Sequence, residues 1–342
     1  MFRNPLSVGI DIGNHSVKAV VLNQKKDQLK LSGFAEIILT SGIINDQHSV
    51  NTTALLSVMR KLKKRLPFGA RKVTLALPDS AVISKVIQLD ADLSDEEAEF
   101  AVSQALGASS PFPVEELWMD FFPLVSDSFA SPAMTVPYQV FASRKDTIDS
   151  RIAAIKKAGL SPKVMELQTH ALLWLADHYR TTSGMNDHWC VVDIGKRQTG
   201  FCIKPTGAAA YHREIAFGTS QIPDTSVGGG DNMRMLSLPE QPSSLPSDVM
   251  ESFTKQLANH LKRQFQLYNS THPRAALKGL WLCGGGQDVV SDELLSRWLG
   301  IEAVWMNPLS CFSSSRKLDV ISTGRYSQYA VAAGLALRGL AE

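Results

Sequence analysis

This chain of 342 residues has no large excess of charge of either sign and no closely spaced pair of cysteines. Its 35 lysines and arginines are balanced by 33 aspartates and glutamates, and the net charge of +2 is too small to argue for a nucleic-acid partner. No Cys-x-x-Cys pair occurs, which indicates free thiols in a reducing compartment, at Cys190, Cys202, Cys283 and Cys311.

Segments that would place the chain in a membrane are also lacking. No uninterrupted apolar run approaches the ~20 residues that a membrane-spanning helix needs. The first residues, MFRNPLSVGID, contain no apolar core of an export signal. We therefore expect a cytoplasmic protein without direct membrane insertion, peripheral to a membrane only through a partner.

Several catalytic signatures are missing as well. The histidines show no spacing typical of metal ligands, and neither a Ser-His-Asp set nor a Gly-x-Ser-x-Gly elbow can be assembled. The Gly-x-Gly-x-x-Gly fingerprint of dinucleotide-binding domains is absent. Hydrolase and oxidoreductase functions therefore have little support.

What the chain does contain is a repeated Asp-Ile-Gly segment. Val8–Leu22 and Val191–Ile203 each read as an apolar run, Asp-Ile-Gly, a short polar loop and a second apolar run. Such a pattern predicts a β-hairpin in each half of the chain. Because the copies are separated by about half the chain, they indicate two duplicated domains rather than a solenoid.

The two predicted hairpins form a candidate phosphate site. Backbone N–H groups around Gly13 and Gly195 can hold phosphate, and the carboxylates of Asp11 and Asp193 can hold Mg²⁺ through water. A third glycine-rich turn, at Leu282–Gly286, would let the backbone approach an adenine or an α-phosphate through Gly284, Gly285 and Gly286.

These three loops resemble the two phosphate loops and the adenosine loop of the actin and sugar-kinase superfamily. Within it, the first hairpin and the closing segment YAVAAGLALR, at 329–338, look most like the PilM family of type IV pilus assembly. The resemblance covers nearly the whole chain, except about residues 218–248. It implies an α/β, actin-like (ribonuclease H-like) duplicated two-domain fold.

The resemblance also implies roles for individual residues. ATP and Mg²⁺ would be the cofactors, with catalytic or metal roles for Asp11 and Asp193. Glu166 or Gln168 would orient a water towards the γ-phosphate, although the family usually has an acid where Gln168 stands. The remaining nucleotide-binding residues would be Gly13, Asn14, Ser16, Lys18, Gly195, Gly284, Gly285 and Gly286.

Domain boundaries follow from the pattern together with the resemblance. We expect residues 1–80 and 158–185 to form actin-like domain 1A, and residues 81–157 an inserted α+β subdomain, 1C. Ser94 and Glu97 have the spacing of a capping box ahead of a helix in this insertion. Residues 186–342 would form domain 2, with subdomain 2B reduced to a Pro/Ser-rich loop at about 218–248 that keeps Gly228–Asp231.

One predicted helix carries a cluster of positive charges. His48–Leu66 has a helical spacing of apolar residues and a basic face, formed by Arg60, Lys61, Lys63, Lys64 and Arg65. Because no aromatic residues interleave with these cations, we interpret them as a solvated helix face rather than a nucleic-acid patch.

Two functions are consistent with these features. The resemblance implies an actin-like scaffold of a type IV pilus or DNA-uptake (competence) pilus, with ATP as a switch and hydrolysis slow or absent. It would bind the N-terminal cytoplasmic peptide of a PilN-like bitopic inner-membrane protein, in a groove between the insertion and the first half. Edge strands at Val82–Leu89 or Pro137–Ser143 could accept this peptide or mediate self-association.

The alternative is a small-molecule kinase of the same superfamily, with Asp193 or Glu166 as the base. A sugar kinase would need a substantial sugar-binding insertion, whereas this insertion is typical of an assembly subdomain. An FtsA-like division scaffold would need a terminal amphipathic helix, whereas this sequence closes with LALRGLAE.

Overall fold

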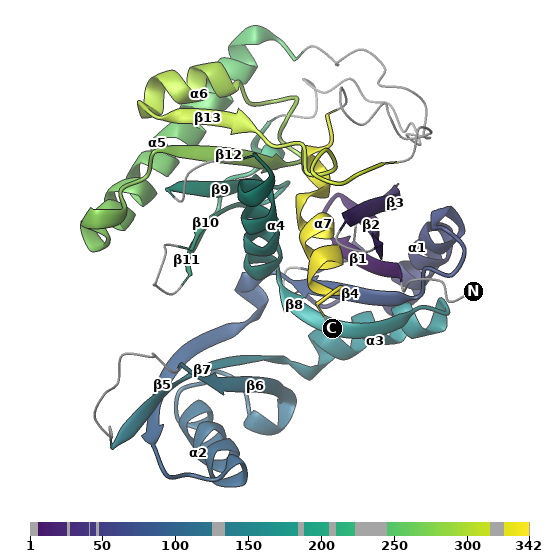
Figure 1. The fold of residues 1–342 in the computed structure, drawn as a ribbon, viewed down its shortest axis with the longest axis vertical. Helices are drawn as coiled ribbons and strands as arrows, with labels where there is room; N and C mark the ends of the chain where they lie inside the picture. Colours follow the sequence, from purple (N-terminus) through teal and green to yellow (C-terminus); the bar gives the residue numbers. More distant parts are fainter. Residues whose placement is uncertain are drawn as a thin grey trace.

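A computed structural model describes residues 6–25, 28–40, 42–45, 48–124, 134–183, 188–204, 210–222, 245–314 and 325–341. Two five-stranded sheets, one in each half of the chain, form its frame (Figure 1). The first has the order β3-β2-β1-β4-β8, formed by β3 (Gln28–Ile38), β2 (Ser16–Lys25), β1 (Leu6–Ile12), β4 (Lys72–Leu77) and β8 (Ser161–Leu167).

The second sheet repeats the first. Its order is β11-β10-β9-β12-β13, formed by β11 (Tyr211–Ile215), β10 (Thr199–Ile203), β9 (Trp189–Ile194), β12 (Gly279–Gly284) and β13 (Glu302–Trp305). In each sheet three strands pair antiparallel and the next two join in parallel. This equivalence confirms the predicted duplication and the actin-like fold class.

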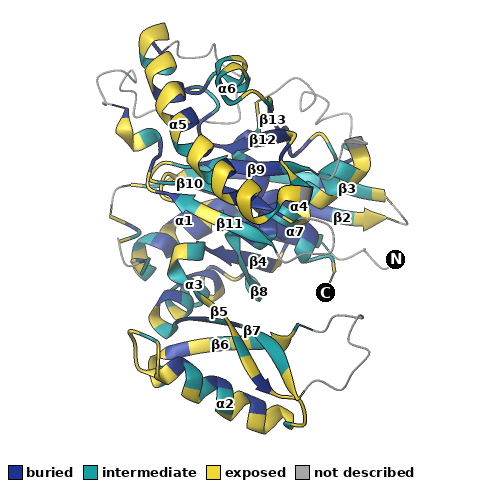
Figure 2. Ribbon diagram, turned by 90° about the vertical axis from the view of Figure 1, so that its left-hand side faces the viewer, coloured by how far each residue is buried: buried dark blue, intermediate teal, exposed yellow. Residues whose placement is uncertain are grey.

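Helices cover both sheets in layers (Figure 1). The first sheet packs against α1 (Thr52–Arg65) and α3 (Lys145–Lys157), and the second against α5 (Ser247–Thr271) and α6 (Asp292–Leu299). Between the sheets lie α4 (Gln168–Ser183) and α7 (Ala330–Arg338), in one buried cluster with residues of both sheets. Figure 2 shows the central strands β9 and β12 buried and the outer side of α5 exposed.

Glycines allow the central helices to approach very closely. A Cβ at Gly334 of α7 would overlap the carbonyl oxygen of Ala171 in α4, and one at Gly9 of β1 would overlap that of Ala332. The halves therefore share a core in which backbone meets backbone, as the small residues of the closing segment suggested.

The insertion forms a separate α+β unit, at the bottom of Figure 1. Strands β5 (Ile83–Asp90), β7 (Thr135–Arg144) and β6 (Leu117–Pro123) form an antiparallel sheet in that order, and α2 (Asp95–Gly107) covers one face of it. The predicted capping box is present, because Ser94 accepts from the Glu97 amide while the Glu97 side chain accepts from Ser94.

Two expectations about the insertion were wrong. Pro137–Ser143 is not an edge strand, because β7 pairs with β5 on one side and β6 on the other. The boundary at residue 157 was placed too late, since Ala154 and Ile155 of α3 are buried in the core of the first half. The last residue in the insertion's own core is Ala142 of β7. Both expectations failed because strand order and helix packing depend on contacts between residues that are distant in the sequence.

In the second half, the stretch between β11 and α5 is described only in part. Thr219–Gln221 forms a turn of 3-10 helix, and residues 223–244 lie outside the described part of the chain. The predicted Gly228–Asp231 segment and most of the reduced subdomain 2B fall there. Their structure stays a prediction.

Candidate functional site

The first hairpin places Asp11 and Lys18 side by side. These residues are register partners on β1 and β2, and Lys18 Nζ lies 3.6 Å from Asp11 Oδ2. The turn is closed by the Gly13 amide, which donates to the Ser16 carbonyl at 3.1 Å, and Asn14 is exposed at its tip. Ser16 itself is buried and donates to Glu36 Oε1 of β3 at 2.6 Å, so its hydroxyl is already used inside the sheet.

The second hairpin repeats this geometry. The Gly195 amide donates to the Gln198 carbonyl at 3.0 Å, and Asp193 occupies on β9 the position that Asp11 has on β1. Gln168, the first residue of α4, donates through Nε2 to Asp193 Oδ2 at 2.9 Å. The side chain predicted at the strand-to-helix turn therefore reaches the second hairpin.

The charge of Asp11 reaches Asp193 in the other half of the chain. Burial, followed by the charge of Asp11, raises the pKa of Asp193 to about 6, while Lys18 and the hydrogen bonds from Gln168 and Cys283 act in the opposite direction. Burial also raises the pKa of Asp11, against the charge of Lys18. Burial disfavours the ionised form of both carboxylates, and a bound cation would favour it.

The glycine-rich turn after β12 reaches the same place. Gly284 has a φ of +89°, and a Cβ there would overlap Asp193 Oδ1, so only glycine fits against this carboxylate. A Cβ at Gly286 would press on Ile194, whereas one at Gly285 would meet open space. Gly285 is therefore the residue of this turn with room for a ligand beside its backbone.

Glu166, which the resemblance placed near the γ-phosphate, is held by two side chains. Its Oε1 lies 3.0 Å from His170 Nδ1, and its Oε2 accepts from Arg338 Nε of α7 at 3.2 Å. Burial disfavours its charge, but hydrogen bonds from His170 and the Leu167 amide, together with Arg338, hold the pKa of Glu166 below its ordinary value. A carboxylate bound in this way joins β8, α4 and α7 and is poorly placed to act as a base.

The sequence reasoning missed a carboxylate near this site, that of Asp79, which binds the residue after Gln168. It follows β4, and its Oδ2 accepts from the amide and hydroxyl of Thr169 at 3.1 and 2.8 Å. Its Oδ1 is buried without a hydrogen-bond partner. A signal was present in the sequence, because Asp79 stands two residues after the apolar run that forms β4.

A second missed acid faces Asp79 from the other half. Burial, and then the charge of Asp79, raises the pKa of Glu214 on β11, which accepts from Gln198 Nε2 at 2.8 Å. Asp79 and Glu214 therefore add two acids to the group that contains Asp11 and Asp193. Among the described residues, no group of three or more metal-ligating side chains is preassembled.

Asp193 makes a prediction about pH possible. Because its pKa is raised from 3.8 to about 6, its ionisation destabilises the fold as the pH rises through that window, and this penalty is fully present above it. We expect Asp193→Asn to raise the free energy of unfolding by about 1–3 kcal/mol near pH 8 and to change it little near pH 4. Urea unfolding at both pH values measures this.

The matched control for that measurement is Asp92→Asn, which removes an exposed acid from the insertion. It should leave the free energy of unfolding unchanged at both pH values. A wild-type-like pH profile in Asp193→Asn would show that Asp193 is not strained by burial beside Asp11.

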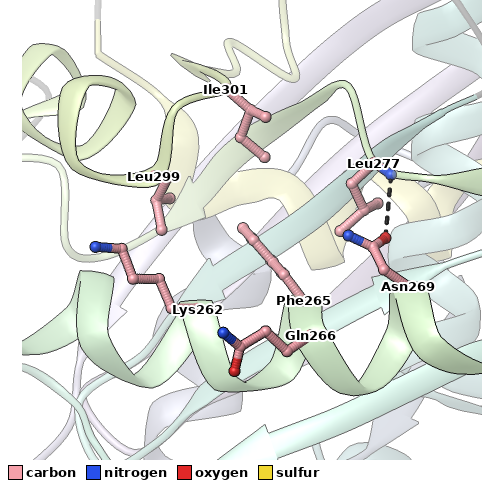
Figure 3. A pocket seen from close by; sticks show the side chains of 7 residues that line it. All are labelled: Lys262, Phe265, Gln266, Asn269, Leu277, Leu299 and Ile301. Carbon is pink, nitrogen blue, oxygen red and sulfur yellow. Dashed lines mark hydrogen bonds between the residues drawn. The ribbon is translucent and has the colours of Figure 1, made fainter.

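A pocket of about 300 Å³ is lined by residues of the second half, none of which belongs to the site described above (Figure 3). It is formed by α5 and the segments around β13, and Leu277 N–H donates to Asn269 Oδ1 at its rim. Lys262 is the one charged residue that lines the pocket, and we assign the pocket no role. The lining residues are Lys262, Phe265, Gln266, Asn269, Leu277, Leu299 and Ile301.

Two matching sheets, two aspartate-bearing hairpins and a glycine turn at their junction define a protein of the actin-like ATPase fold. The structure of the "PilM-PilN type IV pilus biogenesis complex" matches with a TM-score of 0.77 and 22% identity, over 98% of each chain. A diol dehydratase-reactivating factor in nucleotide-free form matches with a TM-score of 0.55 and 10% identity, over 99% of this chain and 100% of that one.

The ethanolamine utilization protein EutJ from Carboxydothermus hydrogenoformans matches with a TM-score of 0.50 and 14% identity, over 98% of this chain and 90% of that one. The sequence profile of the type IV pilus assembly protein PilM matches residues 9–340. The chain therefore belongs to the PilM family.

Proposed function

We propose that this protein is a scaffold of the inner-membrane assembly platform of a type IV pilus or a DNA-uptake pilus. It binds the N-terminal cytoplasmic peptide of a PilN-like bitopic membrane protein. Membership of the PilM family supports this, as does the likeness in fold to a protein solved in a complex with PilN. Within the described residues no helix has the length and apolarity to cross a bilayer.

The observation that carries the docking site is an apolar face of the insertion. The strand register places Val86 of β5, Trp118 and Phe122 of β6, and Phe141 of β7 on the side of the sheet opposite α2. We call these four residues the insertion face. Val86, Trp118 and Phe122 are 55%, 51% and 46% exposed, although large apolar side chains on a sheet are usually covered.

Three contacts join the insertion face to α3 and α4. The Phe141 ring lies edge-on to His170 of α4, with centroids 5.6 Å apart. Trp118 Nε1 donates to Asp149 Oδ1 of α3 at 3.1 Å, and Lys145 Nζ lies 5.2 Å from the centre of its ring. A peptide on this face would therefore touch the insertion and the first half together.

The outer strands offer a way to hold an extended peptide. Both β5 and β6 are edges of the insertion sheet, so either can add a strand while the insertion face supplies apolar pockets. Ordering a disordered tail costs entropy, so we expect an affinity in the micromolar range. The same edges would serve self-association of two copies.

Replacement of Trp118 and Phe122 by alanine tests the docking site. We expect at least about a tenfold loss of affinity for the partner's N-terminal peptide, since central aromatic residues carry most of the energy of such interfaces. Fluorescence anisotropy of a labelled synthetic peptide measures this. The matched control is Phe100→Ala, which removes a 65% exposed aromatic from α2, beyond the insertion face.

Equal affinity in the double variant, with unchanged thermal unfolding, would place the peptide elsewhere. Equal weakening by Phe100→Ala would show that the effect is general to the insertion.

For the site around Asp11 and Asp193, we propose weak binding of Mg·ATP as a conformational switch. Asp11 and Asp193 would hold the magnesium ion through water, and Lys18 and the turn around Asn14 would face the phosphates. Gly285 leaves room for the nucleotide beside its backbone. Both acids are buried, and the charge of Asp11 disfavours ionisation of Asp193. A bound magnesium ion would favour the ionised carboxylates, which supports its placement here.

Hydrolysis in this proposal is slow. Glu166 is held by His170 and Arg338, and Gln168 is an amide already bonded to Asp193, so neither is a strong base beside the γ-phosphate. An alignment of base, metal and phosphate would require these side chains to change partners.

A further inference from the structure

One end of the first half carries a dense group of cations. Residues 60–72 contain seven lysines and arginines and no acid. Lys63 and Arg65 are used internally, because they donate to the carbonyls of Ala158 and Glu36. The basic edge, as we define it, consists of eight exposed residues: Arg60, Lys61, Lys64, Arg71, Lys72, Lys156, Lys157 and Lys163.

The topology brings these residues together. Strands β4 and β8 run in parallel with Lys72 opposite Ser161, so Arg71, Lys72 and Lys163 lie at the same end of the sheet. Helices α1 and α3 both finish at this end, since the bond from Lys63 to Ala158 joins their last turns. Figure 1 shows α1, α3 and the starts of β4 and β8 on one side of the first half.

The basic edge is not accounted for by helix ends alone. Lysines in the last turns of α1 and α3 complement the negative ends of the helix dipoles. Arg71, Lys72 and Lys163, however, lie on a turn and on strands. No salt bridge within the described residues joins any of the eight cations to an acid, so their charges add into one positive field.

An aromatic residue lies on the turn between α1 and β4, both of which carry cations of the basic edge. Pro67–Ala70 form a β-turn in which the Ala70 amide donates to the Pro67 carbonyl at 3.1 Å, and Gly69, with a φ of +91°, gives it type II geometry. Phe68 stands at the corner of the turn and is 84% exposed. It is flanked in the sequence by Lys64 and Arg71 of the basic edge.

We propose that the basic edge and Phe68 form a peripheral docking surface for an anionic phospholipid bilayer. The cations bind the lipid phosphates, and the Phe68 ring enters the interfacial layer. Charge complementarity selects a bilayer with anionic headgroups, and an apolar ring at the tip of a rigid turn suits a lipid interface better than an acidic protein surface. This contact refines the expectation that the membrane is reached only through a partner, and it does not depend on the peptide site.

The test is sedimentation of the full chain with vesicles in the absence of any partner. Vesicles of phosphatidylglycerol and phosphatidylethanolamine are compared with vesicles of phosphatidylcholine, at about 0.1 M and about 0.5 M salt. The charge-reversal variant is Lys64→Glu with Arg71→Glu and Lys72→Glu. Its matched control reverses three exposed cations of α5, Lys255, Lys262 and Arg263, and therefore changes the net charge equally.

We expect the wild type and the α5 control to bind anionic vesicles at low salt, and the basic-edge variant to lose at least about tenfold in partitioning. Phe68→Ser should weaken partitioning severalfold, whereas Phe100→Ser should not. Thermal unfolding checks that each variant is folded.

Three results would overturn the proposal: failure of the wild type to sediment with anionic vesicles, equal loss in the α5 control, or equal binding to phosphatidylcholine. Retention of the wild type by polyglutamate but not by vesicles would indicate an acidic protein partner instead.

Discussion

Gly334→Ala is expected to lower the free energy of unfolding by about 3 kcal/mol or more, a large share of the roughly 5–15 kcal/mol that stabilises a typical protein. The added methyl group would overlap the Ala171 carbonyl oxygen, which is backbone and cannot rotate away. Helices α4 and α7 would have to separate, and they lie in the buried cluster that joins the two sheets. Urea unfolding of the purified variant measures the loss.

Gly285→Ala is the matched control for this change. A methyl group there meets open space, and Gly285 is exposed, so the free energy of unfolding should stay within about 0.5 kcal/mol of the wild type. If Gly334→Ala were as stable as this control, the two central helices would not pack backbone to backbone.

Asp11→Ala combined with Asp193→Ala is expected to weaken Mg·ATP binding by at least about 50-fold. Each carboxylate would contribute charge-assisted bonds to the magnesium hydration shell, of the order of 1.5–3 kcal/mol apiece. Isothermal titration calorimetry measures the affinity, and Asp90→Ala with Asp92→Ala removes two exposed acids from the insertion as the control.

An unchanged affinity in the variant that lacks both aspartates would contradict the nucleotide site. Complete absence of binding in the wild type would mean that the two hairpins are purely structural. Rapid hydrolysis, or phosphoryl transfer to a small molecule, would favour the kinase alternative instead.

The hairpins and the capped helix could be predicted from the sequence because their signals are local. Asp-Ile-Gly between two apolar runs is sufficient for a strand, a turn and a returning strand. Ser94 and Glu97 fix the start of α2 through bonds within four residues. The duplicated fold then followed from finding the same local pattern twice.

Features that depend on distant contacts could not be predicted in this way. The sequence of β7 resembles that of an edge strand. Only the strand order of the folded sheet shows that it lies in the centre. The partner of Glu166, Arg338, is 172 positions away. Strand β11, with the sequence YHREI, was missed because its polar side chains hide the alternation, although its pairing with β10 is regular.

The central claim, that the insertion face binds the membrane partner's tail, is tested most directly by site-specific cross-linking. A photoreactive amino acid at Val86 or Phe122 would be compared with one at Phe100, all of them exposed and all in the insertion. In cells that make the full chain and the PilN-like protein, we predict a cross-link to that protein's N-terminal segment from positions 86 and 122 and none from position 100. Cross-links from position 100 alone, or from none of the three, would contradict the account.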